Sequence, residues 1–537
     1  MKKQVYTALF LACSVPALAQ IPEDALRMGY TVPGGTARSQ AIGGANGALG
    51  GDISTLFTNP AGLGFYKTSE IVLSPMFGFY NGKGSFRGTD AQGNAFNRFS
   101  LGTSGFVTGW SDRYSNWGSK AFAIGINQTA NFNGMTHYKG VNDYSSYSEN
   151  MADEFARYYR SQRERYPDYS DEQIIDDALD ENSLSLLTKM GLYTYLIDAV
   201  RDNNGVGTVF SRAEEAFPLN QEKTIKTTGG ITEISLGMGA SMNDKFYLGG
   251  SIGIPIVNYN RTSIYRESDV NGTGNDEFDF SEYKEEYSSK GVGFNARLGM
   301  IFKPVAPLRI GLAVHSPTFY GLRDKFSSIM TTNLDTLDDI RDGNGGFTNQ
   351  VSVASRDFFN GSNPSFKYNN TSPWRFIASG AWMFNAVEDV TKQQGFISAD
   401  IEYVTYGSSR MHSADEYENE GDDQYFKDLN NVIKGEYKGT FNFRVGGELK
   451  FNTLMTRLGF AHYGNPYKDG ALNASRTNLS GGLGYRDKGI FVDVTYVHSI
   501  YKNVDFPYRL DNPDRANTFA ETTQNNGQVI LTVGIKL

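Results

Sequence analysis

Five arginines stand on strand-like stretches in which apolar and polar residues alternate, and all five occupy the polar face. They are Arg297, Arg309, Arg375, Arg444 and Arg457. A guanidinium group stays charged and can bind a carboxylate through two parallel hydrogen bonds. Two interpretations follow. Either the arginines form a lattice of internal ion pairs, or one or two of them hold the head group of a ligand with an apolar tail. Arg309 and Arg444 are our candidates for the second role.

Carboxylates of matching placement occur at Asp400, Glu402 and Glu448. These three residues are the expected partners of the arginines in an ion-pair lattice. Asp400 and Glu402 lie on one face of a strand and about 7 Å apart by the rise of a strand. Such a pair can act as a general acid and base, but a hydrated wall is the interpretation that we favour.

Other residues with catalytic chemistry lack the spacing that a site needs. The five histidines stand at positions 137, 315, 412, 462 and 498 and form no close pair. The run GGANGALGG has neither a preceding strand nor a following Lys-Ser/Thr, so it is not a phosphate-binding loop. The acidic segment 269–276 does not have the spacing of a calcium loop. We therefore expect no enzyme, no cofactor and no metal ion.

The composition is unusual for a cytosolic enzyme. The 537 residues include 60 glycines, 32 tyrosines and 36 phenylalanines, yet only 39% are hydrophobic and the mean hydropathy is −0.41. A membrane β-barrel has this composition, because its strands carry apolar residues on alternate positions only. The formal net charge of −9 argues against nucleic acid as a partner.

The N-terminus is typical of a secretory signal peptide spanning residues 1–19. Lys2 and Lys3 precede a mostly apolar stretch, and Ala17-Leu18-Ala19 provides a cleavage site after Ala19. A lipoprotein signal that uses Cys13 is the alternative. Cleavage after Ala19 removes the only cysteine and takes the net charge from −9 to −11. A mature chain without an apolar run of about 18 residues is then periplasmic, released, or an outer-membrane barrel.

Alternation and connection lengths favour the barrel. In GQVILTVGIKL, for example, Val529, Leu531, Val533, Ile535 and Leu537 share one face. A soluble sandwich alternates in the same way, but every second connection here is short and the others are long and polar, as in outer-membrane barrels. Fourteen strands, an even number, allow closure without a free edge. Their predicted centres are residues 75, 104, 125, 236, 252, 297, 312, 379, 401, 445, 458, 482, 495 and 532.

One long connection, residues 135–228, has helical patterns. Ser170 followed by Gln173 predicts a capping box at a helix start. The apolar face of a later helix, with Leu186, Leu187, Leu192 and Tyr195, either packs on the outer mouth of the barrel or collects an apolar ligand. We favour packing. A smaller helical segment is expected around residues 425–434.

The stretch GTARSQAIGGANGALGGDISTLFTNPAGLGFY resembles the N-terminal segment of FadL-type outer-membrane transport proteins, which carry long-chain fatty acids or aromatic hydrocarbons. The shared pattern is a Gly/Ala-rich run, an acidic residue with Ser or Thr, and Asn-Pro-Ala-Gly. Here it is formed by Asp52, Ser54, Thr55, Asn59, Pro60, Ala61 and Gly62. The stretches SSKGVGFNARLGMIFKPVAPLRIGLAVHSP and FISADIEYVTYG resemble strands of the same family.

The resemblance implies a fold and a function. The fold is an all-β transmembrane barrel, residues 67–537, with an N-terminal plug, or hatch, formed by residues 20–66 and a helical extracellular insertion. An N-terminal cap on the barrel rim is the alternative to a plug. The implied ligand is a hydrophobic small molecule taken up passively through the outer membrane, with membrane lipid around the barrel. The implied ligand-binding or hatch residues are Phe57, Asn59, Pro60 and Leu63, together with Arg309 and Arg444.

A second function belongs to another class. A barrel of this kind can be a non-transporting subunit of a secretion or surface-attachment complex, where it serves as an interaction platform for other envelope proteins. An apolar tunnel from the loops to the plug would favour transport. A solid interior with a flat apolar loop face would favour the platform.

Overall fold

The computed structural model describes residues 22–537 except 33, 113, 182, 202–206, 272–276, 336–339, 342–346, 386–393, 415–419 and 513. The expected signal peptide, its cleavage site and Cys13 lie outside the described residues. So does most of the acidic segment 269–276.

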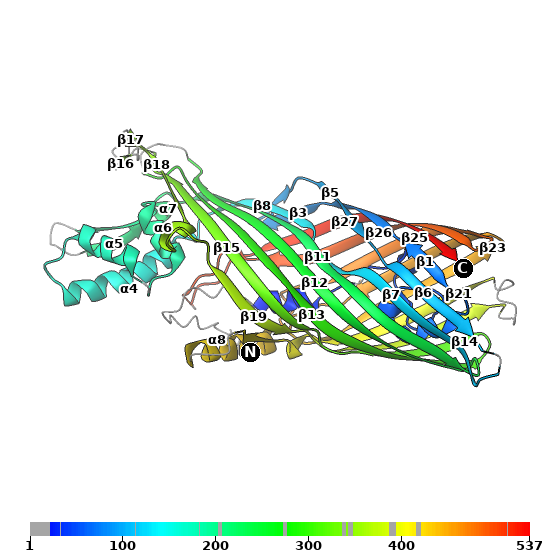
Figure 1. Cartoon of the computed structure of the whole chain (residues 1–537). Helices are drawn as coiled ribbons and strands as arrows, with labels where there is room; N and C mark the ends of the chain where they lie inside the picture. The colour runs from blue at the N-terminus through cyan, green and yellow to red at the C-terminus, as the bar shows by residue number, and fades with distance from the viewer. Residues whose placement is uncertain are drawn as a thin grey trace, which may run out of the picture.

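Fourteen antiparallel barrel strands follow one another around a wall formed by the described residues, and several combine two consecutive β-strands (Figure 1). The first seven are β1 (Glu70–Leu73) with β2 (Pro75–Tyr80), β5 (Phe96–Leu101) with β6 (Ser104–Ser111), β7 (Trp117–Asn131) with β8 (Gly134–Asn142), β11 (Leu219–Met242), β12 (Phe246–Asp269), β13 (Phe280–Val305), and β14 (Leu308–His315) with β15 (Phe319–Asn333). The other seven are β19 (Ser365–Thr371) with β20 (Arg375–Phe384), β21 (Gly395–Thr405) with β22 (Arg410–Ser413), β23 (Gly439–Phe451), β24 (Leu454–Tyr463), β25 (Arg476–Asp487), β26 (Ile490–Asp505) and β27 (Ala520–Lys536). All fourteen predicted centres fall within these strands.

The wall closes on itself where the two ends of the chain meet. Glu70 of β1 lies opposite Lys536 of β27 on one side and opposite Val107 of β6 on the other. Closure satisfies the backbone groups that an open edge would expose to lipid. Because the large sheet closes on itself through β1 and β27, the barrel interpretation is confirmed and the sandwich is not.

The outer surface carries a belt of exposed apolar side chains. On β27, the residues Leu531, Val533 and Ile535 are 39–47% exposed, whereas Thr532 between them is fully buried on the inner face. The same alternation holds along β23 and β26. A belt of this kind is stable only against lipid. Among the described residues, no helix is long and apolar enough to cross a membrane.

The two rims of the barrel differ. Short turns such as Met242–Lys245 and Asp487–Ile490 lie at one end, as predicted. At the other end the connections are long, and β11, β12 and β13 extend well beyond the belt with 24 to 26 residues each. A hairpin of β3 (Gly82–Phe86) and β4 (Thr89–Gln92) also rises there. Smaller elements of this rim are β16 (Ile340–Arg341), β17 (Phe347–Thr348), β18 (Gln350–Ala354), η2 (Ser355–Phe358) and η4 (Tyr406–Ser408).

The N-terminal segment lies inside the barrel and forms the expected plug. It contains α1 (Pro22–Gly29), α2 (Ala37–Ala41), α3 (Thr55–Thr58) and the 3₁₀ helix η1 (Pro60–Phe65). Most of its side chains are buried, including polar ones such as Asn59. Wall side chains alone do not fill the lumen of a closed barrel of this width, and here the N-terminal segment occupies it.

The helical insertion stands on the long-loop rim. It holds α4 (Glu149–Arg165), α5 (Asp171–Asp180), α6 (Leu186–Tyr193), the hairpin of β9 (Ile197–Arg201) and β10 (Gly207–Ser211), and α7 (Arg212–Glu215). These elements occupy residues 143–218, a narrower range than 135–228, because β8 and β11 pair with each other from Asn142↔Leu219 to Gly134↔Thr227. The expected capping box is present, since Ser170 Oγ accepts from the Gln173 backbone N–H at 3.1 Å.

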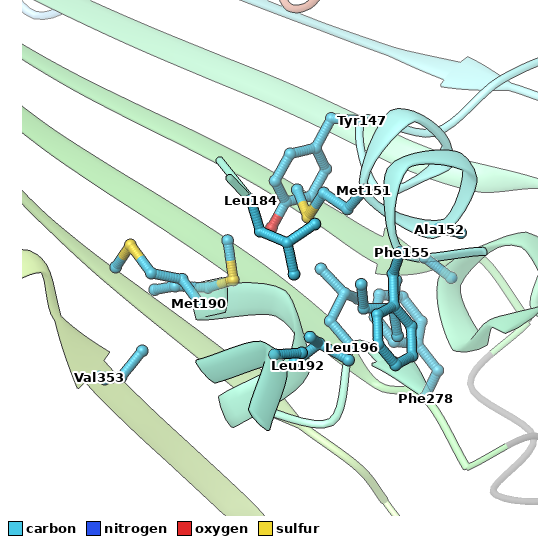
Figure 2. Close-up of a cluster of buried hydrophobic side chains, with 14 of the residues drawn as sticks. Tyr147, Met151, Ala152, Phe155, Leu184, Met190, Leu192, Leu196, Phe278 and Val353 are labelled. Atoms are coloured by element: carbon cyan, nitrogen blue, oxygen red, sulfur yellow. The ribbon is translucent and has the colours of Figure 1, made fainter. Parts of the chain in front are cut away.

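The apolar face of the insertion packs rather than standing open. Met151, Phe155 and Leu192 form a buried cluster that reaches Phe278 and Val353 on the barrel side (Figure 2). Leu186 and Leu187 pack against the same cluster, and Tyr195 is 39% exposed. The packing interpretation therefore fits these contacts. The second predicted helix is α8 (Glu420–Glu436), which packs on α1.

Candidate functional site

Asn59 fastens the plug to the barrel wall. Its Nδ2 donates to the carbonyl oxygen of Gly47 at 2.6 Å within the plug, and to those of Met300 at 3.2 Å and Leu312 at 3.4 Å on the wall. Its Oδ1 accepts from the Ala61 backbone N–H, which starts the 3₁₀ helix at Pro60. The side chain is fully buried. Asn59 thus supports the plug and points no group toward an open lumen.

Asp52 organises the interior of the plug. Its carboxylate accepts from the Thr36 hydroxyl at 2.8 Å and from the backbone N–H and hydroxyl of Ser54 at 2.9 and 2.6 Å. Thr36 caps the N-terminus of α2 through the Ser39 backbone N–H. The acidic residue with Ser or Thr in the sequence motif is therefore a hydrogen-bonding centre that holds two turns together.

Close backbone approach explains the glycines at this interface. Gly43 has a φ of +68°, and a Cβ there would lie 2.7 Å from the carbonyl oxygen of Phe460 on the wall. On the wall, a Cβ at Gly299 would overlap the side chain of Asn59. Only glycine permits both the conformation and the contact.

The inward arginines form ion pairs, as the lattice interpretation expects. Arg444 lies 3.6 Å from Asp400 and 3.3 Å from Glu402, and Arg375 lies 3.3 Å from the same Glu402. Arg375 also donates to the carbonyl oxygen of Gly29 at the end of α1 at 2.6 Å. One cluster thus joins three barrel strands to the plug.

Two further ion-pair groups lie on the inner wall. Arg457 bonds Glu448 at 2.6 Å and Asp493 at 2.5 Å, and the plug residue Arg38 reaches Glu448 at 3.3 Å. Elsewhere, Arg297 bonds Glu233 through both terminal nitrogens at 2.6 and 2.9 Å. Glu233, Asp493 and Arg38 were not recognised in the sequence, because pairs between distant strands leave no local spacing.

Arg309 is different from the other four arginines. No ion pair joins it to any residue that the structure describes. Its guanidinium lies 4.5 Å from the ring centre of Phe65, at the end of the plug, and Phe65 stacks on Tyr247 at 3.8 Å. A cation over an aromatic face is an attractive contact. Arg309 is therefore a cation held only by the plug.

The apolar residues proposed for ligand binding are packed in this structure. Leu63 is fully buried, and Phe57 is 3% exposed. Both belong to a cluster that includes Val72 and Val107 of the wall. Pro60 lies against Gly249 of β12. The structure thus brings Phe57, Asn59, Pro60 and Leu63 together at the plug–wall contact. Arg444 reaches the same region near Phe57, whereas Arg309 lies at the end of the plug beside Phe65.

A small polar cavity lies between the plug and the wall. Its volume is about 60 Å³, enough for a few water molecules and too small for a fatty acid. Phe57 and Arg444 line it, together with Glu233, Asn295, His315 and Thr318. His315 donates to the carbonyl oxygen of Thr58 at 2.7 Å. The cavity adjoins breaks before Thr318 and Trp374, each marked by a Ser-Pro step that the sequence shows.

An unpaired seam runs along the barrel wall between β5 and β7. β6 pairs with β7 from Ser111↔Ser119 to Ser104↔Ile126, and the pairing stops there. Beyond it, β5 pairs with β2 only, while β7 continues to Asn131 along β11. A bulge at Thr129 bends β7 beside this gap. Gln128 is level with Thr232, whose other neighbour Ile256 belongs to the apolar belt.

Two plug glycines fill the seam from inside. The Gly34 backbone N–H donates to the Gln128 carbonyl at 2.8 Å, and the Gly35 carbonyl accepts from the Thr103 backbone N–H at 3.2 Å. Asn127 Nδ2 donates to the Gly34 carbonyl at 3.3 Å. The plug backbone therefore replaces the missing strand pairing between β5 and β7.

Together these features define a class: a closed transmembrane barrel of fourteen strands whose lumen is blocked by its own N-terminal segment.

The chain matches no family model and no curated protein sequence. Solved structures do match. A FadL homologue from Pseudomonas aeruginosa aligns with a TM-score of 0.51 and 13% identity, over 94% of this chain and 99% of that one. The Pseudomonas putida toluene transporter TodX aligns with a TM-score of 0.46 and 11% identity, over 95% and 99%. The Ralstonia pickettii toluene transporter TbuX gives 0.47 and 13%, over 94% and 98%. The fold of this chain is the FadL type.

Proposed function

We propose that this barrel is an outer-membrane channel that takes up hydrophobic small molecules passively and releases them sideways through the seam between β5 and β7. The observation that carries the proposal is the seam itself, across which the plug residues Gly34 and Gly35 hydrogen-bond to the wall. The resemblance of the N-terminal segment to FadL-type transport proteins makes long-chain fatty acids and aromatic hydrocarbons the candidate ligands.

The axis of the barrel is a poor route for an apolar molecule. The lattice around Arg444 and Glu402 and the buried plug lie across it. Passage along the axis would break buried ion pairs, which is strongly unfavourable. A sideways exit at the level of Ile256 leads directly into lipid instead, where transfer of apolar surface is favourable by about 25 cal/mol per Å².

The proposed roles of the site residues follow from their contacts. Arg444 already neutralises two carboxylates, so it is a poor candidate for a ligand head group. Arg309 has its guanidinium on Phe65 alone and is the better candidate. Phe57 and Leu63 would contact a ligand tail only after the plug moves, since both are packed against the wall.

A reversible cross-link tests the seam. Cysteines at Gly34 and Asn127 should form a disulfide, because a Cβ at Gly34 would lie 3.2 Å from the side-chain oxygen of Asn127 on β7. Cys13, the only natural cysteine, lies in the expected signal peptide. We expect oxidation to stop uptake of labelled oleate and toluene into cells, and a reductant to restore it. A matched pair at Ala41 and Ser480 joins the plug to β25, away from the seam, and should leave uptake unchanged.

The outcomes separate the proposals. Uptake that continues with the seam pair fully oxidised would refute the lateral route. Absence of uptake even in the reduced protein would refute transport. The result would support the interaction platform as the function instead. The small volume of the internal cavity, about 60 Å³, also favours that function. Under that function, deletion of the insertion should abolish co-purification of envelope proteins without affecting the barrel.

The proposed location follows from the belt and the expected signal peptide. The mature chain should begin at Gln20 and fractionate with the outer membrane, with the long-loop rim outside. Like other closed barrels, it should migrate differently on gels before and after heating. Lipid attached to Cys13 or recovery in the soluble periplasm would contradict this assignment.

A further inference from the structure

Strands β13, β15 and β19 are neighbours in the barrel wall (Figure 1). Three cations form one row across their outer surface. Lys290 lies directly opposite Arg323, and Arg323 lies directly opposite Lys367. All three side chains are exposed. Lys325, one outward position further along β15, is exposed as well and lies opposite Ser288.

The arrangement is unfavourable for the protein by itself. Like charges directly opposite on antiparallel strands repel and destabilise the sheet. The charge of Lys284, an outward lysine on β13, is compensated by an ion pair with Glu286 at 2.7 Å. For Lys290, Arg323 and Lys367, the described part of the chain supplies neither an ion pair nor a hydrogen bond. An anion from outside the chain would remove the repulsion.

The row stands at the edge of the apolar belt on the long-loop side. The next two outward positions toward the belt centre on β13 are Val292 and Phe294, which are 57% and 51% exposed. Phe294 lies opposite Phe319 of β15, which is 59% exposed. The surface therefore presents cations at the height of lipid head groups and large apolar side chains at the height of acyl chains.

We propose that this surface binds a lipid whose head group carries more than one phosphate, from the leaflet on the long-loop side. The phosphates lie on Lys290, Arg323 and Lys367, and the acyl chains cover Val292, Phe294 and Phe319. A head group with two phosphates fits the row, because three strands spaced about 4.8 Å apart place the outer cations about 10 Å from each other. The inference requires the transmembrane barrel and its orientation but not transport.

Native mass spectrometry of the purified protein tests the proposal, with lipid A, which carries two phosphates, as the probe. The test variant is Lys290→Gln/Arg323→Gln/Lys367→Gln. We expect its affinity for lipid A to fall about 100-fold, since each interfacial cation contributes roughly a factor of five. The control variant Lys245→Gln/Lys303→Gln/Lys488→Gln removes three cations at the short-turn rim and should bind as the wild type does.

Two further measurements identify the source of the phosphate. Lipid A without its phosphates should bind the wild type as weakly as the test variant binds lipid A. Inorganic phosphate should not displace bound lipid A when the total ionic strength of the solution is held constant. Equal binding of lipid A by the test variant and the wild type would overturn the proposal, and so would full displacement by inorganic phosphate. Because the side chains are exposed, the test variant should still show the gel shift of a folded barrel.

Discussion

Single residues at the plug–wall contact hold the plug in place through several hydrogen bonds each. Asn59 was a candidate ligand-binding or hatch residue, and its donated hydrogen bonds connect Gly47 of the plug with Met300 and Leu312 of the wall. A buried amide that satisfies several carbonyls is costly to remove, because those carbonyls then lose partners away from water.

Replacement of Asn59 by alanine should therefore destabilise the plug by about 1–3 kcal/mol. We expect faster proteolysis of the N-terminal segment in detergent and an unchanged gel shift of the barrel. Asn94→Ala, on the exposed long-loop rim, is the control and should have no effect. Equal proteolysis of the two variants would show that the plug does not depend on Asn59.

Glu267 joins the insertion to the barrel above the membrane. It is fully buried and accepts hydrogen bonds from Ser146 at 2.5 Å, from the Tyr147 backbone N–H at 3.1 Å and from Gln221 at 2.8 Å. Tyr265 donates to it as well, at 2.7 Å. Burial raises the pKa of Glu267 to about 7 from an ordinary value of 4.5. The folded insertion therefore favours the protonated carboxyl.

The attachment of the insertion should weaken as pH rises. Between about pH 4.5 and pH 7, the Glu267 carboxyl ionises when the segment is unfolded but stays protonated when it is folded. The folded state is therefore destabilised, by about 3 kcal/mol at pH 8. Amide hydrogen exchange at Ser146–Ser148 should speed up over this range in the wild type. Glu267→Gln should remove this pH dependence. An identical profile in both proteins would assign the effect to another group.

At the scale of elements, pairing decides where the barrel ends and the insertion begins. β8 and β11 pair up to Asn142↔Leu219, so the helices have a continuous stem that reaches far beyond the belt. The loop 166–170 between α4 and α5 is then remote from the membrane. Figure 1 shows the insertion at the end opposite the short turns.

Proteinase added to intact cells should cut at residues 166–170 and spare the turn Asp487–Ile490. The first site lies on the outer rim in the proposed orientation, and the second faces the periplasm. Permeabilised cells are the control and should show both cuts. Cleavage at 487–490 alone in intact cells would invert the orientation.

At the scale of the whole molecule, the wall and the plug have different structural roles. The wall closes through β1 and β27 without the plug, since Glu70–Leu73 pairs directly with Val533–Lys536. The plug fills the lumen and the seam through hydrogen bonds to wall residues such as Thr103 and Gln128. The barrel wall can therefore close without the plug, and the plug is needed only to block the lumen and the seam.

Deletion of residues 34–64 should leave a folded barrel that conducts ions in planar bilayers, because water fills an unplugged lumen of this width. It should also lose uptake of hydrophobic probes. Deletion of residues 149–211 from the insertion is the control and should leave ion conductance at the wild-type level. A plug deletion that stays closed to ions would mean that wall side chains alone block the lumen.

The sequence by itself indicated the closed barrel, the fourteen strand centres and the two helical segments. These features depend on local patterns: a period of two along a strand, turn length, and caps such as Ser170 with Gln173. The plug was expected only from the resemblance to FadL-type proteins. The arginines on the polar face were also visible, and a lattice of ion pairs between them and Asp400, Glu402 and Glu448 was one of the two interpretations.

Only the tertiary structure decided which arginine pairs with which carboxylate, and that Arg309 lies on Phe65 instead. It alone revealed the seam and the row of Lys290, Arg323 and Lys367. These features depend on the register between strands far apart in the chain, and a shift of one residue would turn each of those side chains to the other face. Register is set by the closure of the entire barrel, so no local stretch of the sequence contains it.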